Sequence, residues 1–113
     1  MKKKVAIIGS RSFNDYEFLK EKLNPDSISI IVSGGAFGAD ELAEQYAEEH
    51  EIPMRIFKPN WKLGKHAGLL RNIEIVDFCD FVIAFWNGKS KGTKHAIEYA
   101  KKIGKEVVIY EIV

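Results

Sequence analysis

Short apolar segments alternate with segments of helical periodicity along the whole of this 113-residue chain. Five segments are mostly apolar or β-branched, as the strands of a buried sheet are, and they cover residues 5–8, 28–32, 54–57, 80–86 and 107–110. Between them, apolar residues recur every three or four positions, which predicts four amphipathic helices near residues 14–23, 39–47, 65–77 and 94–103. This alternation predicts a parallel sheet, because each parallel strand needs a crossover before the next strand.

The predicted strands are continuously apolar instead of alternating with polar residues, which indicates that helices cover both faces of the sheet. Right-handed crossovers then favour a doubly wound arrangement in which the strands, numbered along the chain, lie in the order 3-2-1-4-5. We therefore predict an α/β fold with an open parallel five-stranded sheet and helices on both faces. The length suits one domain over residues 1–113, without an internal repeat or linker.

Composition excludes several classes of protein. Hydrophobic residues make up 46% of the chain and charged residues 29%, which is ordinary for a globular domain and unlike a disordered chain. No apolar run approaches the roughly 18 residues of a membrane span, and no secretory signal follows Met1, so we expect a cytoplasmic protein without a membrane partner. The single cysteine, Cys79, excludes an internal disulfide. His66 and His95 lack the spacing of zinc ligands, so we expect no metal and no cofactor.

The charges are balanced overall but unevenly distributed. The formal net charge of +1 argues against a partner selected by bulk charge, such as duplex DNA. Basic residues cluster from Lys58 to Arg71, without an intervening carboxylate, and again from Lys89 to Lys94. Such clusters are ordinary solvated faces unless the fold places them beside a backbone anion site.

Three glycine-containing loops follow the first, second and fourth predicted strands. They are Gly9 to Ser12, Ser33 to Asp40 and Asn87 to Thr93. In a doubly wound sheet the carboxyl ends of these strands share one edge, beside the switch point where ligands bind. Glycine lets backbone N–H groups approach an anion, and the following helix N-terminus adds positive potential, so the expected ligand group is phosphate. The hydroxyls of Ser10, Ser90 and Thr93 and the guanidinium of Arg11 supply further donors.

Each of these features also has a purely structural explanation. Glycine makes tight turns, Ser90 suits the N-cap of the following helix, and Asp40 complements a helix dipole. We favour a phosphate site because three such loops are expected to converge. The chain contains neither the P-loop string nor the dinucleotide fingerprint, which argues against ATP hydrolysis and hydride transfer. Trp61 and Trp86 could each stack on a base or be partly buried in the core, and Arg71 could be an ordinary surface residue.

Four motifs, in this order, resemble the YspA-like branch of the SLOG superfamily. They are Gly9-Ser10-Arg11, Ser33-Gly34-Gly35-Ala36-x-Gly38-x-Asp40, Trp61-x-x-Gly64-Lys65-x-Ala67-Gly68-x-x-Arg71-Asn72 and Ser90-x-Gly92-Thr93. The resemblance covers nearly the whole chain, and its most specific parts are the Gly-Gly-Ala and Arg-Asn strings. It implies a Rossmann-like domain that binds nucleotides or nucleotide-derived ligands and forms a homo-oligomer. Relatives in this superfamily include the Lonely-guy phosphoribohydrolases, DprA-type DNA-processing proteins and sensors of ADP-ribose-derived signals.

The similarity to the Lonely-guy enzymes is partial. Those enzymes carry an arginine nine residues before the aspartate that opens their fourth strand, and Arg71 and Asp80 reproduce this interval. Their Pro-Gly-Gly-x-Gly-Thr motif and its following catalytic glutamate are not matched, because residues 86–93 are two residues longer and the next carboxylate is Glu98. Cleavage of an N-glycosidic bond needs a carboxylate at the sugar, so we favour binding over catalysis and assign no catalytic residue.

The sequence thus predicts a domain that binds a nucleoside monophosphate or an ADP-ribose-like signal at the carboxyl edge of its sheet, as a sensor or sequestering module. The predicted binding residues are Gly9, Ser10, Arg11, Gly34, Gly35, Ala36, Asp40, Arg71, Asn72, Trp86, Ser90, Gly92 and Thr93. One alternative is a nucleotide N-glycosidase. The other is a protein that binds single-stranded nucleic acid through the two basic clusters, which the near-neutral net charge makes the weaker hypothesis.

Overall fold

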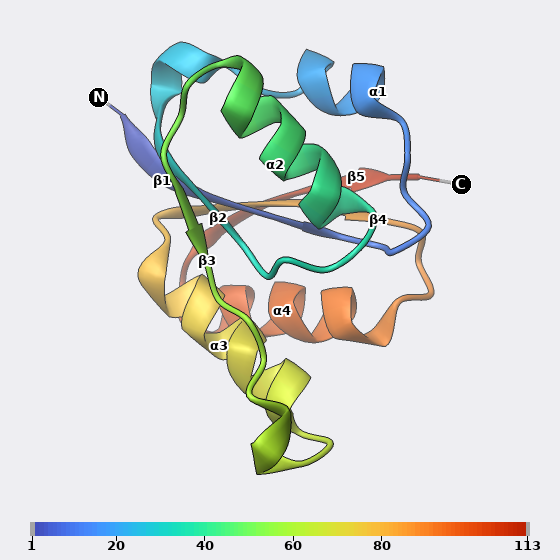
Figure 1. Cartoon of the computed structure of the whole chain (residues 1–113). Helices are drawn as coiled ribbons and strands as arrows, with labels where there is room; N and C mark the ends of the chain where they lie inside the picture. The colour runs from blue at the N-terminus through green and yellow to red at the C-terminus, as the bar shows by residue number, and fades with distance from the viewer. Residues whose placement is uncertain (1, 113) are drawn as a thin grey trace.

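Five parallel strands form one sheet in the computed structural model, which describes residues 2–112 (Figure 1). The strands are β1 (Lys3–Gly9), β2 (Ile28–Ser33), β3 (Met54–Ile56), β4 (Phe81–Trp86) and β5 (Glu106–Glu111). They lie in the order β3-β2-β1-β4-β5, and every neighbouring pair is parallel. This confirms the predicted fold class and strand order. The winding reverses between β1 and β4, so the carboxyl ends of these strands mark the switch point.

Four helices cover the two faces of the sheet. They are α1 (Tyr16–Glu21), α2 (Ala39–Glu49), α3 (Ala67–Phe78) and α4 (Lys91–Lys102), and the short 3-10 turns η1 (Pro25–Ser27) and η2 (Trp61–Leu63) precede β2 and α3. α1 and α2 lie on one face of the sheet, and α3 and α4 lie on the other (Figure 1). No helix within residues 2–112 is both long enough and apolar enough to cross a membrane.

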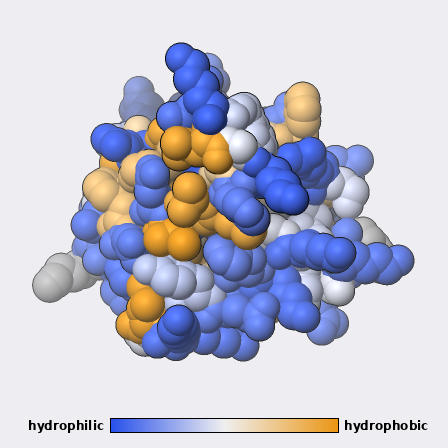
Figure 2. Space-filling view, turned by 90° about the horizontal axis from the view of Figure 1, so that it is seen from below, coloured by the Kyte–Doolittle hydropathy of each residue, from blue (hydrophilic) through white to orange (hydrophobic). Residues whose placement is uncertain are grey.

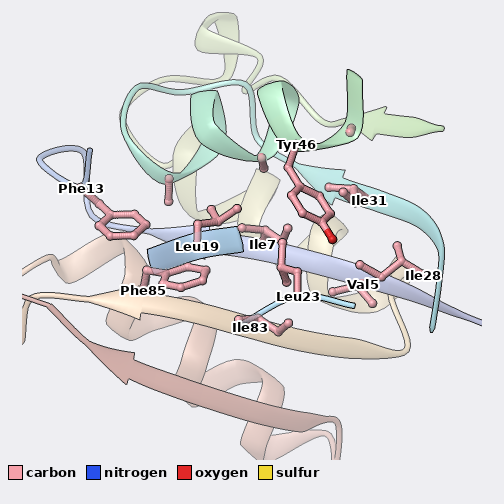
Figure 3. Packing of buried hydrophobic residues seen from close by; sticks show 13 residues of the cluster. Val5, Ile7, Phe13, Leu19, Leu23, Ile28, Ile31, Tyr46, Ile83 and Phe85 are labelled. Atoms are coloured by element: carbon pink, nitrogen blue, oxygen red, sulfur yellow. The ribbon is translucent and has the colours of Figure 1, made fainter. Parts of the chain in front are cut away.

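Burial on both faces explains why the strands are continuously apolar. In β1, Val5 and Ile7 belong to the cluster beneath α1 and α2, whereas Ala6 between them belongs to the cluster that packs against α3 and α4. This follows from the geometry of a strand, in which successive side chains point to opposite faces. Figure 3 shows the first cluster, where the rings of Phe13 and Phe85 stack with their centroids 4.9 Å apart.

The structure corrects the expected start of the first helix. Asn14 and Glu17 have the spacing of a capping box, which predicts Asn14 as the N-cap. The N-cap is instead Asp15, whose Oδ1 accepts a hydrogen bond from the N–H of Phe18 at 3.1 Å. Asparagine and aspartate cap helices about equally well, so two such residues in succession leave the choice to the path of the preceding loop.

Candidate functional site

The loops after β1, β2 and β4 line one cleft at the carboxyl edge of the sheet. The cleft has a volume of about 540 Å³. The predicted site residues that line it are Gly9, Ser10, Arg11, Ala36, Asp40, Arg71, Asn72, Ser90, Gly92 and Thr93. Its lining also includes residues that the sequence analysis did not select, namely Ile8, Ser12, Ile75, Asn87, Lys89 and Ala96. Most of the predicted residues are therefore neighbours in space, although they come from four separate segments of the chain.

The remaining predicted residues lie outside this cleft. Gly34 and Gly35 line an adjacent hollow instead. Trp86 lines neither space: its indole Nε1 donates a hydrogen bond to the carbonyl oxygen of Ser90 at 3.0 Å, and it packs against the cluster on the α3 and α4 side. In this position Trp86 supports the loop that leads into α4.

Ser10 connects the loops after β1 and β4. Ser10 is buried, with 1% of its surface exposed. Its Oγ accepts a hydrogen bond from the N–H of Asn87 at 3.1 Å, and its own N–H donates to the carbonyl oxygen of Phe85 at 3.0 Å. The Oδ1 of Asn87 in turn accepts hydrogen bonds from the N–H groups of Lys89 and Ser90, at 2.8 and 2.9 Å. These bonds fix the two loops against each other while the hydroxyl of Ser10 keeps its own hydrogen for donation.

Arg71 and Asn72 connect the loop after β2 to the start of α4. The guanidinium Nη1 of Arg71 donates to the carbonyl oxygen of Gly34 at 2.8 Å, and its Nε donates to Oδ1 of Asn72 at 3.0 Å. The Nδ2 of Asn72 then donates to the carbonyl oxygen of Gly92 at 3.2 Å. Burial lowers the pKa of the Arg71 guanidinium, and the nearby charge of Asp40 opposes this effect. The guanidinium is thus held in place with its remaining N–H groups available to a ligand.

Asp40 is the one acidic residue in the lining of the cleft. Its Oδ2 accepts a hydrogen bond from the N–H of Ala36 at 3.0 Å, which closes the loop before α2. Burial raises the pKa of the Asp40 carboxyl, although the Ala36 N–H and the charge of Arg71 oppose this. Because Arg11, Arg71 and Lys89 also line the cleft, cations outnumber carboxylates there and favour an anion. Within residues 2–112, no cluster of three metal-ligating side chains forms.

Unpaired backbone donors border the cleft on two sides. Ser90 is the N-cap of α4, since its Oγ accepts a hydrogen bond from the N–H of Thr93 at 3.4 Å and lies 3.0 Å from the Thr93 hydroxyl oxygen. This arrangement leaves the N–H of Gly92 without a partner among residues 2–112. The N–H groups of Arg11 and Ser12, in the loop after β1, are likewise unpaired within that range. These three groups are backbone donors at the border of the cleft that have no partner within residues 2–112.

The loop after β2 differs from the expectation that its amides reach an anion. The N–H of Gly35 donates to Oγ of Ser33 at 3.3 Å, and that of Gly38 donates to Oε1 of Glu41 at 3.2 Å. Together with the bond from Ala36 to Asp40 described above, these interactions pair three N–H groups of the loop with acceptors in Ser33 and the first turn of α2. This loop therefore contributes the shape of the wall and the anchor for Arg71.

Comparison with known proteins gives two matches in sequence. A family model described as "YspA, cpYpsA-related SLOG family" matches residues 3–64 of this chain. The Gene 61 protein of Mycobacterium phage D29 is 35% identical over 118 residues, and the alignment covers 94% of each of the two chains.

Three solved structures share the fold. DNA processing protein A (DprA) from Streptococcus pneumoniae has a TM-score of 0.78 at 22% identity, covering 96% of this chain and 50% of that one. DprA from Helicobacter pylori, described for its single-stranded DNA binding mode, has a TM-score of 0.72 at 24% identity, covering 94% of this chain and 64% of that one. The structure of TM1055 has a TM-score of 0.71 at 21% identity, covering 95% of this chain and 72% of that one. This chain spans only about half to two thirds of the DprA chains, and the likeness establishes the shared fold.

Proposed function

This chain belongs to the YspA, cpYpsA-related SLOG family, and from this premise we propose that it binds the phosphate of a nucleotide or nucleotide-derived ligand in the cleft. One observation carries the proposal: the N–H groups of Arg11, Ser12 and Gly92, unpaired within residues 2–112, border the same cleft as the guanidinium of Arg71. Backbone N–H groups at a helix N-terminus and an arginine fork are the donors that suit phosphate oxygens. The protein would act as a sensor or sequestering module.

The size of the cleft suits a nucleoside monophosphate or part of an ADP-ribose-like ligand. Its volume of about 540 Å³ lies within the range of small-molecule sites, which is roughly 300–1,000 Å³. In the proposed complex the N–H groups of Arg11, Ser12 and Gly92 and the hydroxyls of Ser90 and Thr93 hold the phosphate, while Arg71 adds charge. The loop from Gly9 to Arg11 forms one wall of the site.

Isothermal titration calorimetry with AMP, ADP-ribose and adenosine tests this proposal. We expect both phosphorylated compounds to bind, and adenosine to bind about 100-fold more weakly because it lacks the charge-assisted hydrogen bonds. Equal affinities for AMP and adenosine would contradict a phosphate site. Chromatography of the same mixtures tests the N-glycosidase alternative, which would gain support from release of free adenine that is abolished in Asp40→Asn.

Gly34→Ala is expected to weaken AMP binding about tenfold, roughly the contribution of one charge-assisted hydrogen bond. A Cβ at Gly34 would overlap the Arg71 guanidinium, whose Cζ would lie only 2.8 Å away, so the guanidinium must move. Calorimetry measures the affinity. Gly68→Ala is the matched control, because the nearest atom to its Cβ would be Cη2 of Trp61 at 3.9 Å, an ordinary contact. Equal AMP affinities of the two variants would show that the position of Arg71 is irrelevant to binding.

Anion binding is expected to strengthen as pH falls through the pKa of the Asp40 carboxyl. Burial raises the pKa of this carboxyl above its ordinary value of 3.8. The carboxyl therefore takes up a proton at a higher pH than a free aspartate does, and the cleft then loses a negative charge. The same sign applies to stability, since the contribution of Asp40 to the free energy of unfolding falls as pH rises through its folded-state pKa. Sulfate, which keeps its double charge in this range, is the probe. Compared with the wild type, Asp40→Asn should bind sulfate more tightly at neutral pH, and its sulfate affinity should change less with pH. If the affinities of the two proteins changed with pH in parallel, Asp40 would not be responsible for the pH dependence.

Single-stranded nucleic acid is a second candidate ligand. Two observations favour it: the similarity to the H. pylori DprA structure and the series Lys58, Lys62 and Lys65 between β3 and α3. Fluorescence anisotropy with a labelled ten-residue oligodeoxyadenylate would then show affinity that falls steeply with salt, with a log–log slope of about −0.7 per phosphate contacted. Affinity that does not change with salt would exclude this candidate.

We also propose that the protein is cytoplasmic and forms a homo-oligomer. Figure 2, which views the molecule from the side of α3 and α4, shows hydrophobic side chains gathered on this face, and Leu69 and Leu70 of α3 are exposed. Exposed apolar patches of this kind mark interaction surfaces. Sedimentation velocity should show a dimer for the wild type and a monomer for Leu70→Glu; a monomeric wild type would refute self-association.

A further inference from the structure

A second hollow adjoins the cleft at Arg71. Its volume is about 380 Å³, and its lining shares Arg11, Ala36 and Arg71 with the cleft. The rest of its lining consists of Gly34, Gly35, Phe37, Lys58, Pro59 and Trp61. Because three residues border both spaces, a ligand whose phosphate lies in the cleft can continue into the hollow past the guanidinium.

Two large aromatic side chains are exposed in this hollow. Phe37, from the loop after β2, is 70% exposed, and Trp61, from η2, is 63% exposed. Among the large hydrophobic residues that are exposed within residues 2–112, these two are the aromatic ones, and both line the hollow. Exposed aromatic faces in a concave site are a feature of ligand binding rather than of the core.

The turn that carries Trp61 is ordered by its own hydrogen bonds. Asn60 accepts a hydrogen bond at Oδ1 from the N–H of Lys62 at 3.2 Å, and its carbonyl oxygen accepts one from the N–H of Leu63 at 2.9 Å. The indole Cη2 lies 3.9 Å from the position of a Cβ on Gly68, so the ring rests close to the first turn of α3. An aromatic face that is already in place loses little conformational entropy when a base stacks on it.

Cations lie beside these aromatic side chains. Lys58 lines the hollow with its stem against Gly35, where a Cβ would lie 3.7 Å from Cε of the lysine. Arg71 is fixed at the boundary by its hydrogen bond to Gly34. Aromatic faces interleaved with cations are the arrangement that binds bases linked by phosphates.

We propose that the hollow between Phe37 and Trp61 binds the base of a second nucleotide unit, so that the ligand contains at least two nucleotide units joined through phosphate. The inference rests on the proposed function, which places the first phosphate in the cleft. Stacking of one base on an aromatic side chain strengthens binding about tenfold or more. A free dinucleotide and a single strand both carry this chemistry.

Calorimetry with AMP and with 5′-phosphorylated diadenylate (pApA) tests the inference. The wild type should bind pApA at least about tenfold more tightly than AMP. Trp61→Ala and Phe37→Ala should remove most of this gain and leave the affinity for AMP unchanged. Leu63→Ala is the matched control, because Leu63 lies on the same turn, is 61% exposed and lines neither space, so both affinities should be retained. All three side chains are exposed, so the variants should fold.

Equal affinities for AMP and pApA, or a gain that survives both aromatic substitutions, would overturn the inference and leave the phosphate site intact. Failure of AMP to bind would overturn the proposed function instead. In that case, pApA binding that Trp61→Ala weakens would still support base binding in the hollow. Absence of pApA binding, or pApA binding that Trp61→Ala does not change, would overturn base binding in the hollow. The affinity for a ten-residue oligodeoxyadenylate distinguishes a single strand from a free dinucleotide as the natural ligand. An affinity higher than that for pApA indicates a strand, and an equal affinity indicates a free dinucleotide.

Discussion

Replacing Gly92 with glutamate is expected to lower the affinity for AMP about 100-fold and, at the same time, to stabilise the fold. The new carboxylate would lie at the N-terminus of α4, beside the N–H group assigned to phosphate, where it repels a phosphate dianion and occupies its place. Space is available, because Gly92 is exposed and the nearest atom to its Cβ would be Nδ2 of Asn72 at 3.9 Å. Removal of a helical glycine and the favourable interaction with the helix dipole together add about 1 kcal/mol to the free energy of unfolding.

Calorimetry gives the affinity of this variant, and urea unfolding gives its stability. Gly92→Gln is the matched control, because glutamine has the shape of glutamate without its charge. We expect Gly92→Gln to gain stability through helix propensity and to bind AMP far more tightly than Gly92→Glu does. Equal AMP affinities for the two variants would show that no anion binds at this helix terminus.

Arg71→Ala is expected to lower the affinity for AMP by about 100-fold as well, but with a loss of stability of about 1–3 kcal/mol. The affinity falls because the cleft loses an arginine fork. The stability falls because the carbonyl oxygen of Gly34 and Oδ1 of Asn72 each lose a hydrogen-bond donor, and Asp40 loses a compensating charge. Calorimetry and urea unfolding measure the two effects separately.

Asn72→Ala distinguishes the two roles of Arg71. It breaks the hydrogen bonds to Arg71 and to Gly92 but leaves the guanidinium charge in the cleft. We expect a loss of stability close to that of Arg71→Ala and a loss of AMP affinity of about tenfold or less. If Arg71→Ala and Asn72→Ala reduced AMP affinity equally, Arg71 would act only as a bridge between loops.

The fold could be predicted because the burial of each strand and helix produces a recognisable local pattern in the sequence. Val5, Ala6 and Ile7 are all buried, on two opposite faces of one strand, and this appears in the sequence as an uninterrupted apolar run. Such runs, separated by helical periodicity, restrict the chain to a parallel sheet with few possible strand orders. The position of the cleft then follows from the switch point of the winding.

Side-chain roles within the site depended on contacts that the local sequence does not show. Arg71 bonds to a residue 37 positions away, and Asn72 to one 20 positions away, so their bridge became visible only in three dimensions. Trp86 was included among the predicted binding residues, with stacking or partial burial left open, and its indole N–H is directed to the loop before α4. Phe37 was an unspecified position within its motif, although it is highly exposed. Asn87 could have been found, because an Asn-Gly pair is a recognisable turn signal.

N–H groups from two separate loops are proposed to bind the same phosphate. A titration of nitrogen-15-labelled protein with AMP, followed by amide resonances, tests it most directly. We predict that the resonances of Arg11, Ser12 and Gly92 shift together and saturate with a single Kd, and that adenosine does not shift them. Resonances that stay unchanged while AMP binds, or that saturate with different midpoints in the two loops, would contradict the claim.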